Sequence, residues 1–141
     1  MAGATNMEHY FEGLAAVLQN ALAAGERYTA SFDAEETDFV RMNRGKVRQP
    51  GSVAQRYLTI RLIDGARHAE HTLSLTGDLA GDGRAVRDAV DGLRAVLPEL
   101  VDDPLLLLPP SVQSSRSVRA ASLPPSESVI DEILASAAGL D

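Results

Sequence analysis

The residue types that most often carry acid–base or metal chemistry are scarce in this chain. It contains three histidines, His9, His68 and His71, and no cysteine. None of the histidines is followed by glutamate, so the H-E-x-x-H helix of zinc peptidases is absent from the sequence. His68 and His71 are three residues apart, and on a β-strand such residues point to opposite faces of the sheet. We therefore expect no metal ligand, no cofactor and no catalytic residue in this chain.

His68 and Glu70, by contrast, would share one face of a strand, with Arg61 and Thr59 close to them. The simplest interpretation of this group is a solvated polar face. A second hypothesis is an enzyme that uses His68 and Glu70, although neither a G-x-S-x-G elbow nor a Gly-rich phosphate loop accompanies them. We retain His68 and Glu70 as weak polar-face candidates.

The strongest chemical pattern is a run of positive charge. Between Phe39 and Ile63 there are six basic residues and no acidic residue, whereas the remaining chain holds seven basic and twenty acidic residues. The net charge of −7 argues against a general nucleic-acid binder, and only Phe39 and Tyr57 would offer stacking among these cations. The pattern fits either an ordinary charged sheet face or a site for an acidic partner or a peptide's carboxylates. The candidate partner-binding residues are Arg41, Arg44, Lys46, Arg48, Arg56 and Arg61.

These side chains must be positioned by the helices and strands that the sequence pattern predicts. From Met7 to Ala24 the apolar residues follow the spacing of one helical face. Apolar and polar residues then alternate in short runs typical of half-buried strands, with a connection expected at 34–36 and a break at 50–52. Two further helices are expected at 82–100 and 127–138. The strands are expected at 28–33, 37–43, 57–63 and 66–76.

The clearest hairpin joins the last two predicted strands. Asp64-Gly65 is a favoured two-residue turn, and it would place Ile60 opposite Ala69 and Arg61 opposite His68. Because side chains alternate along a strand, one face of this hairpin is mostly apolar and the other is polar. The order of elements predicts an α+β domain, in which an antiparallel sheet of about four strands has helices packed on one face.

The predicted organisation has three parts. An N-terminal α+β domain is expected at 1–103, a Pro-rich extended strap or linker at 104–125, and a short C-terminal helix at 126–141 that leads toward a further domain. Neither a signal peptide nor a membrane span is expected, because the longest apolar stretch, Pro104–Pro110, is far shorter than the roughly 20 residues that a bilayer requires. We expect a cytoplasmic protein, and the absence of cysteine is compatible with a reducing compartment.

Two segments of the strand region carry a resemblance to a known family. They read FVRMNRGKV at 39–47 and LTIRLIDGA at 58–66, and Thr72 and Leu73 fit the return strand that follows them. Together with the helix expected from Asp82, they resemble the N-terminal region of the TldD/PmbA (TldD/TldE) family, historically called modulators of DNA gyrase. The resemblance covers roughly residues 8–110. The chain departs from the family, in which small residues are common at these stretches, at Arg56, Tyr57, His68, Glu70 and His71.

The resemblance implies a function in proteolysis. The family's catalytic subunit is a metallopeptidase that holds zinc on an H-E-x-x-x-H helix beyond the N-terminal region, and its partner subunit lacks that motif. The two types form a heterodimer that cleaves unfolded peptides. This chain would be the non-catalytic N-terminal domain of either subunit, contributing to dimer assembly and peptide-substrate access, with zinc expected only in the catalytic domain. Its expected partners are a homologous or paired subunit, in a homo- or heterodimer, and an unfolded peptide substrate.

An alternative from another class of protein stays open. The chain would then be a standalone adaptor module that docks an acidic partner through a basic strip on its sheet. On either hypothesis the expected partners are proteins or peptides, and neither nucleic acid nor a membrane is expected.

Overall fold

The computed structural model describes residues 2–119, 122 and 124–137. The chain divides into two compact units, and the first consists of Met1–Glu35 and Gln55–Leu107. The second consists of Glu36–Ala54 and Leu108–Asp141. The predicted continuation of the last helix through Ala138, with 139–141, lies outside the described residues.

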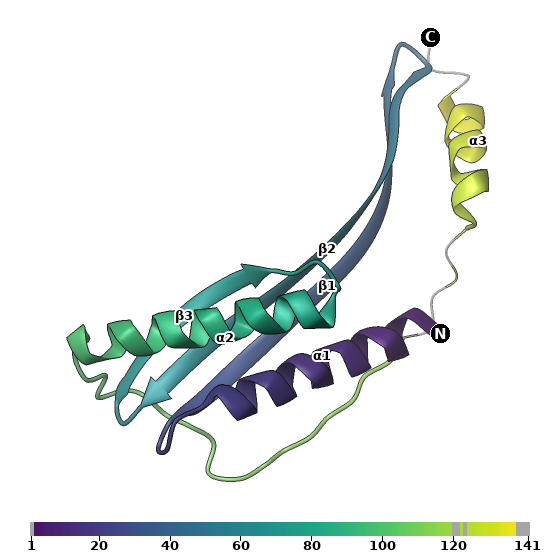
Figure 1. Ribbon diagram of the computed structural model, residues 1–141. Helices are drawn as coiled ribbons and strands as arrows, with labels where there is room; N and C mark the ends of the chain where they lie inside the picture. The colour runs from purple at the N-terminus through teal and green to yellow at the C-terminus, as the bar shows by residue number, and fades with distance from the viewer. Residues whose placement is uncertain (1, 120–121, 123, 138–141) are drawn as a thin grey trace. The chain divides into compact units, whose positions relative to one another are not determined.

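The α+β class predicted from the sequence is confirmed. In the first unit, the first two helices cover one face of an antiparallel sheet whose strand order is β1-β2-β3 (Figure 1). The strands are β1 (Arg27–Asn43), β2 (Lys46–Asp64) and β3 (Arg67–Ser74). The helices are α1 (Ala2–Ala21), α2 (Leu79–Val96), the short η1 (Leu97–Glu99) and α3 (Ser126–Ala137).

The sheet has three strands among the described residues, rather than the four expected. The prediction was wrong because β1 runs without interruption through Ala34–Glu36, so two expected strands are one. Likewise β2 continues through Pro50 and Gly51, where a break was expected. Pro50 lies on a part of β2 that no described strand pairs with on the β3 side, because β3 pairs only with residues 57–64, and proline is tolerated on such edges.

The register of the β2–β3 hairpin also differs from the prediction. Ile60 lies opposite His71 and Arg61 opposite Glu70, because the turn is formed by Gly65 and Ala66 rather than by Asp64 and Gly65. Each residue of β2 therefore faces a partner two positions further along β3 than expected. A shift of two residues keeps every side chain on its predicted face, so the apolar and polar faces are unchanged.

The core of the first unit lies between the helices and the apolar face of the sheet. Side chains from α1, β2 and α2 meet there, and they are fully buried. Burying one such side chain stabilises the fold by about 1.5–3 kcal/mol, so this layer accounts for most of the favourable energy of the unit. The fully buried members of the cluster are Leu14, Leu18, Leu58, Ile60, Leu62, Val86 and Val90.

The second unit combines residues 36–54, here called the distal hairpin, with helix α3. The two strands are joined by a tight turn at Arg44 and Gly45, which have φ values of 50° and 66°. The ring of Phe39 lies against Gly51, where an added Cβ would approach it to 2.7 Å. Among the described residues, none of the helices in either unit combines the length and the apolarity needed to cross a bilayer.

Candidate functional site

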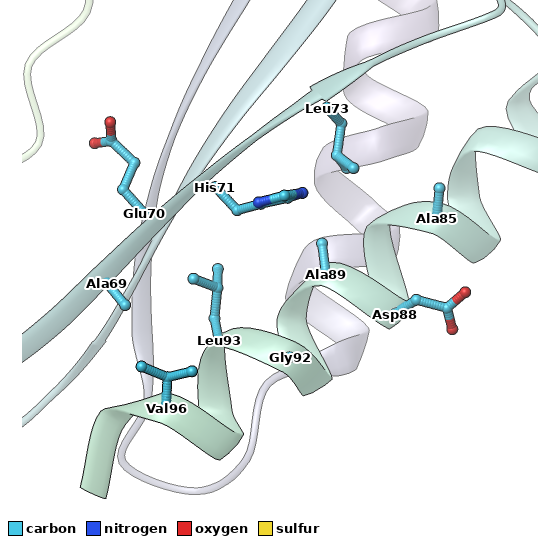
Figure 2. Close-up of a pocket in the computed structure, with 10 residues that line it drawn as sticks. All are labelled: Ala69, Glu70, His71, Leu73, Ala85, Asp88, Ala89, Gly92, Leu93 and Val96. Atoms are coloured by element: carbon cyan, nitrogen blue, oxygen red, sulfur yellow. The ribbon is translucent and has the colours of Figure 1, made fainter. Parts of the chain in front are cut away.

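An open groove, here called the edge groove, lies between strand β3 and helix α2 of the first unit (Figure 2). Its volume is about 620 Å³, which falls within the range of small-molecule and peptide pockets. Most of its lining is apolar. The lining residues are Ala69, Glu70, His71, Leu73, Ala85, Asp88, Ala89, Gly92, Leu93 and Val96.

The groove exists because α2 presents small residues to this side of the sheet. Ala85, Ala89 and Gly92 follow one another along the helix at helical spacing, and a Cβ built on Gly92 would meet nothing within 4 Å. From the opposite wall His71 and Leu73 reach toward the helix (Figure 2), because they share the helix-covered face with the core residues of β2. Larger residues at these helix positions would fill the space that the groove now leaves open.

The free edge of β3 runs beside this groove. β3 is the last strand in the order β1-β2-β3, so no described strand pairs with its outer side. An edge strand presents backbone N–H and C=O groups that a further extended chain can pair with. The start of this edge is already occupied, because the backbone N–H of Asp103 donates to the carbonyl of Ala66 at 2.9 Å. The remaining edge, residues 69–74, lies next to the groove.

The weak candidates His68 and Glu70 lie on the polar face of β3, each engaged with a different partner. The Glu70 carboxylate forms an ion pair with Arg61 at 2.9 Å. The His68 ring nitrogen Nε2 lies 3.0 Å from a carboxylate oxygen of Asp103, and this contact holds the pKa of the Asp103 carboxyl below its ordinary value. His68 thus contacts the segment that follows η1, and Glu70 pairs with the neighbouring strand β2. Among the described residues, neither belongs to a group of three or more His, Cys, Asp or Glu side chains that could hold a metal ion.

The six basic candidates are divided between the two units. Arg61 is paired with Glu70, and the guanidinium of Arg56 lies against Gly77, where it would meet an added Cβ at 3.6 Å. These two arginines belong to the first unit. The other four, Arg41, Arg44, Lys46 and Arg48, lie on the exposed surface of the distal hairpin.

A buried carboxylate that the sequence analysis missed fixes the start of α2. Asp82 accepts hydrogen bonds from the Tyr10 hydroxyl at 2.5 Å, from the backbone and side chain of Thr76, and from the backbone N–H of Gly77 at 2.9 Å. Burial alone would raise the pKa of this carboxyl, but the hydrogen bonds outweigh burial and lower it. Burial and the nearby carboxylate raise the pKa of Tyr10 far above its ordinary value. Asp78, the N-cap of α2, was the only local signal for this arrangement.

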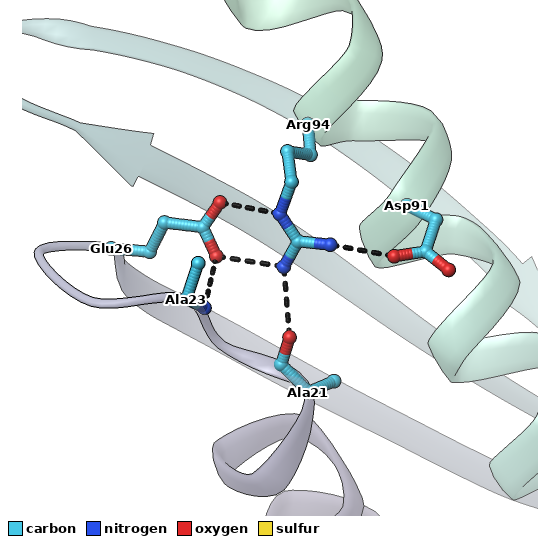
Figure 3. A network of polar contacts seen from close by, with 5 residues as sticks. All are labelled: Ala21, Ala23, Glu26, Asp91 and Arg94. Carbon is cyan, nitrogen blue, oxygen red and sulfur yellow. Dashed lines mark hydrogen bonds and ion pairs between the residues drawn. The ribbon is translucent and has the colours of Figure 1, made fainter.

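A second network, also missed, joins α2 to the end of α1 (Figure 3). The Arg94 guanidinium binds both carboxylate oxygens of Glu26, at 2.6 and 2.8 Å, and donates to the carbonyl of Ala21 at 2.8 Å. It also pairs with Asp91 at 2.6 Å. The hydrogen bond from Arg94 lowers the pKa of Glu26, whose side chain is only 6% exposed. The two networks together hold the helix that forms one wall of the edge groove.

The described residues include no group of three or more His, Cys, Asp or Glu side chains that could hold a metal ion. The chain matches no model of a known protein family. It matches no curated protein either.

Proposed function

We propose that this chain is a non-catalytic peptide-binding and assembly domain that pairs an extended peptide with the free edge of β3. The observation that carries the proposal is the position of this edge beside the apolar edge groove. Backbone pairing at the edge would supply sequence-tolerant affinity, and alternate side chains of the peptide would enter the groove.

The TldD/PmbA resemblance of the sequence gives this binding activity a biological setting. On that basis the chain is the N-terminal domain of a TldD/PmbA-type zinc metallopeptidase, or of its inactive partner subunit. Its role is to help build the dimer and to admit unfolded peptide to a catalytic domain that supplies the zinc chemistry. The α+β architecture, in which β3 is an edge strand of the sheet, supports such a role.

The groove itself supports an extended occupant rather than a compact one. It is open along residues 69–73 of β3 and 85–96 of α2, so its long direction follows the strand. Ala69, His71 and Leu73 are spaced two residues apart and point into it, and the side chains of an added strand would have the same spacing. The imidazole of His71 adds a polar group that can hydrogen-bond a peptide.

Gly92→Leu tests peptide binding at the groove. The added side chain enters open space and leucine favours a helix, so the fold is retained while the groove is filled. We expect affinity for a fluorescein-labelled peptide that alternates valine and threonine to fall about tenfold, which corresponds to about 1.4 kcal/mol. Fluorescence anisotropy measures the affinity, and circular dichroism checks the fold.

The matched control is Ala80→Leu, which adds a leucine at an exposed position in the first turn of the same helix, outside the residues that line the groove. We expect its affinity to stay close to that of the parent chain. A second control is the same peptide with proline at alternate positions, which cannot complete strand pairing. Equal binding of the proline peptide, or an equal loss in both leucine variants, would exclude strand addition at β3.

The assembly role is tested separately by light scattering. The mass of this chain in solution is measured alone and after mixing with full-length subunits of the TldD and PmbA types. A stable complex with either subunit is the expected result. If the measured mass showed no complex with either subunit, the result would contradict the family assignment. Peptide binding at the edge groove would still be tested by the separate anisotropy measurement.

A further inference from the structure

We infer that the distal hairpin is a second binding surface, specific for an acidic segment of another protein and independent of the edge groove. The residues that would carry it are Arg41, Arg44, Lys46 and Arg48, which lie on both strands around one turn. This surface goes beyond the proposed peptide-binding function, because its ligand chemistry is ionic and not apolar.

The four cations lie close together along the chain, and none has a carboxylate partner among the described residues. All are exposed, and all fall within three residues of the turn at Arg44 and Gly45, a span of roughly 10 Å along a strand. None forms an ion pair with any residue that the structure describes, including Asp131 and Glu132, the exposed acids of α3 in the same unit. Like charges within about one Debye length repel one another, and an acidic ligand would relieve this repulsion.

The charge of the remaining chain makes this surface distinct. The full chain has thirteen basic and twenty acidic residues. Without the four hairpin cations, nine basic residues face the same twenty acids, a balance of −11. An acidic ligand is therefore attracted to the distal hairpin and repelled by the rest of the sequence, so the hairpin is where it should bind.

The turn residue supports a functional reason for the charge. Arg44 has a φ of 50°, a left-handed conformation that asparagine and glycine adopt with less strain than arginine. Arg44 lies in the turn itself, with Arg41 on the strand before it and Lys46 and Arg48 on the strand after it. Guanidinium groups bind carboxylates through two parallel hydrogen bonds, which suits aspartate and glutamate side chains.

The aromatic residue of the hairpin argues against single-stranded nucleic acid as the ligand. Base recognition on such a surface depends on stacking against exposed aromatic rings. Phe39, the aromatic residue of the distal hairpin, is partly buried and its ring is packed on Gly51. The guanidinium of Arg41 lies 5.9 Å from the centre of the same ring. A protein segment rich in carboxylates needs no stacking surface and fits the cations alone.

The test compares two double variants that change the net charge equally. Arg44→Gln with Lys46→Gln removes two hairpin cations, and Arg84→Gln with Arg87→Gln removes two exposed cations from α2. Binding of a labelled peptide with alternating glutamate and serine is measured by anisotropy at low and at physiological salt. We expect the hairpin variant to bind about fivefold more weakly, because each exposed charge pair that is lost contributes only modestly to affinity. The α2 variant should bind like the parent chain.

Two further probes complete the test. The same peptide with glutamine in place of glutamate should not bind, and single-stranded oligothymidylate should bind more weakly than the acidic peptide. Equal loss in the two double variants would overturn the proposal, because it would show attraction to net charge alone. Binding of oligothymidylate as tight as that of the peptide would overturn it in favour of a general polyanion surface, and no binding of the acidic peptide would also reject it.

Discussion

Replacing Asp82 with alanine is expected to lower the free energy of unfolding by about 2–4 kcal/mol. The variant removes the shared acceptor of Tyr10, Thr76 and Gly77. Asp82 is only 4% exposed, so water cannot readily take the place of the carboxylate. The groups left without a partner include two backbone N–H donors at the junction between β3 and α2.

Urea unfolding measures this effect as a shift in midpoint at an unchanged slope. Asp88→Ala is the control, since it removes an exposed carboxylate from the same helix and should change stability by less than about 0.5 kcal/mol. Tyr10→Phe completes a double-mutant cycle with Asp82→Ala. If the two substitutions were fully additive, the short contact between Tyr10 and Asp82 would contribute nothing, contrary to our expectation.

The pH dependence of stability gives a second readout of Asp82. Its pKa is lower in the folded chain than in the unfolded chain. The stabilisation is therefore fully present above about pH 4, which is the ordinary pKa of an aspartate in an unfolded chain. It is lost as the pH falls through the lower pKa that Asp82 has in the folded chain. The Asp82→Ala variant should lose less stability than the parent chain over this acid range.

Replacing Arg94 with methionine is expected to destabilise the chain by about 2–4 kcal/mol, because it leaves a buried carboxylate without its cation. Glu26 is almost fully buried and would keep only the hydrogen bond from the backbone N–H of Ala23. Methionine preserves the aliphatic part of the arginine side chain, so the lost energy reports the guanidinium contacts with Glu26 and Ala21. Thermal or urea unfolding measures the loss.

Arg84→Met is the matched control, because Arg84 is an exposed arginine on the same helix. Adding Glu26→Gln to Arg94→Met should recover part of the loss, since a neutral amide is less costly to bury than an unpaired carboxylate. The pKa of Glu26 is lowered in the folded chain. The stabilisation by the Glu26–Arg94 pair is therefore present at pH values above the ordinary pKa of a glutamate, and it declines as the pH falls through the pKa of Glu26 in the folded chain. Equal destabilisation by Arg84→Met would contradict this account.

These two networks matter for function because they set the position of α2. The helix is held at its N-terminal end by Asp82 and near its C-terminal end by Arg94, and the small residues between them form a wall of the edge groove. Variants of either network are therefore expected to weaken peptide binding indirectly, through loss of the folded groove. Gly92→Leu differs from them because it fills the groove without removing a contact.

The sequence by itself determined the features that depend on neighbouring residues. Helical spacing located the helices, and strict alternation assigned the side chains of β2 and β3 to the correct faces even though the register was shifted by two positions. The turn of the long hairpin also follows from its residue types, because Gly45 accepts the positive φ found there. The count of strands was wrong, since local breaks at 34–36 and 50–52 do not end strands whose backbone pairing continues past them.

Only the tertiary structure decided which distant residues meet. Tyr10 and Asp82 are 72 residues apart, and Glu26 and Arg94 are 68 apart, so no local pattern links either pair. The edge groove likewise depends on the distance between α2 and β3, and the division of the basic residues depends on which compact unit each of them joins in the folded chain. Periodicity is a property of one segment, whereas partners, burial and empty space arise only when several segments pack together.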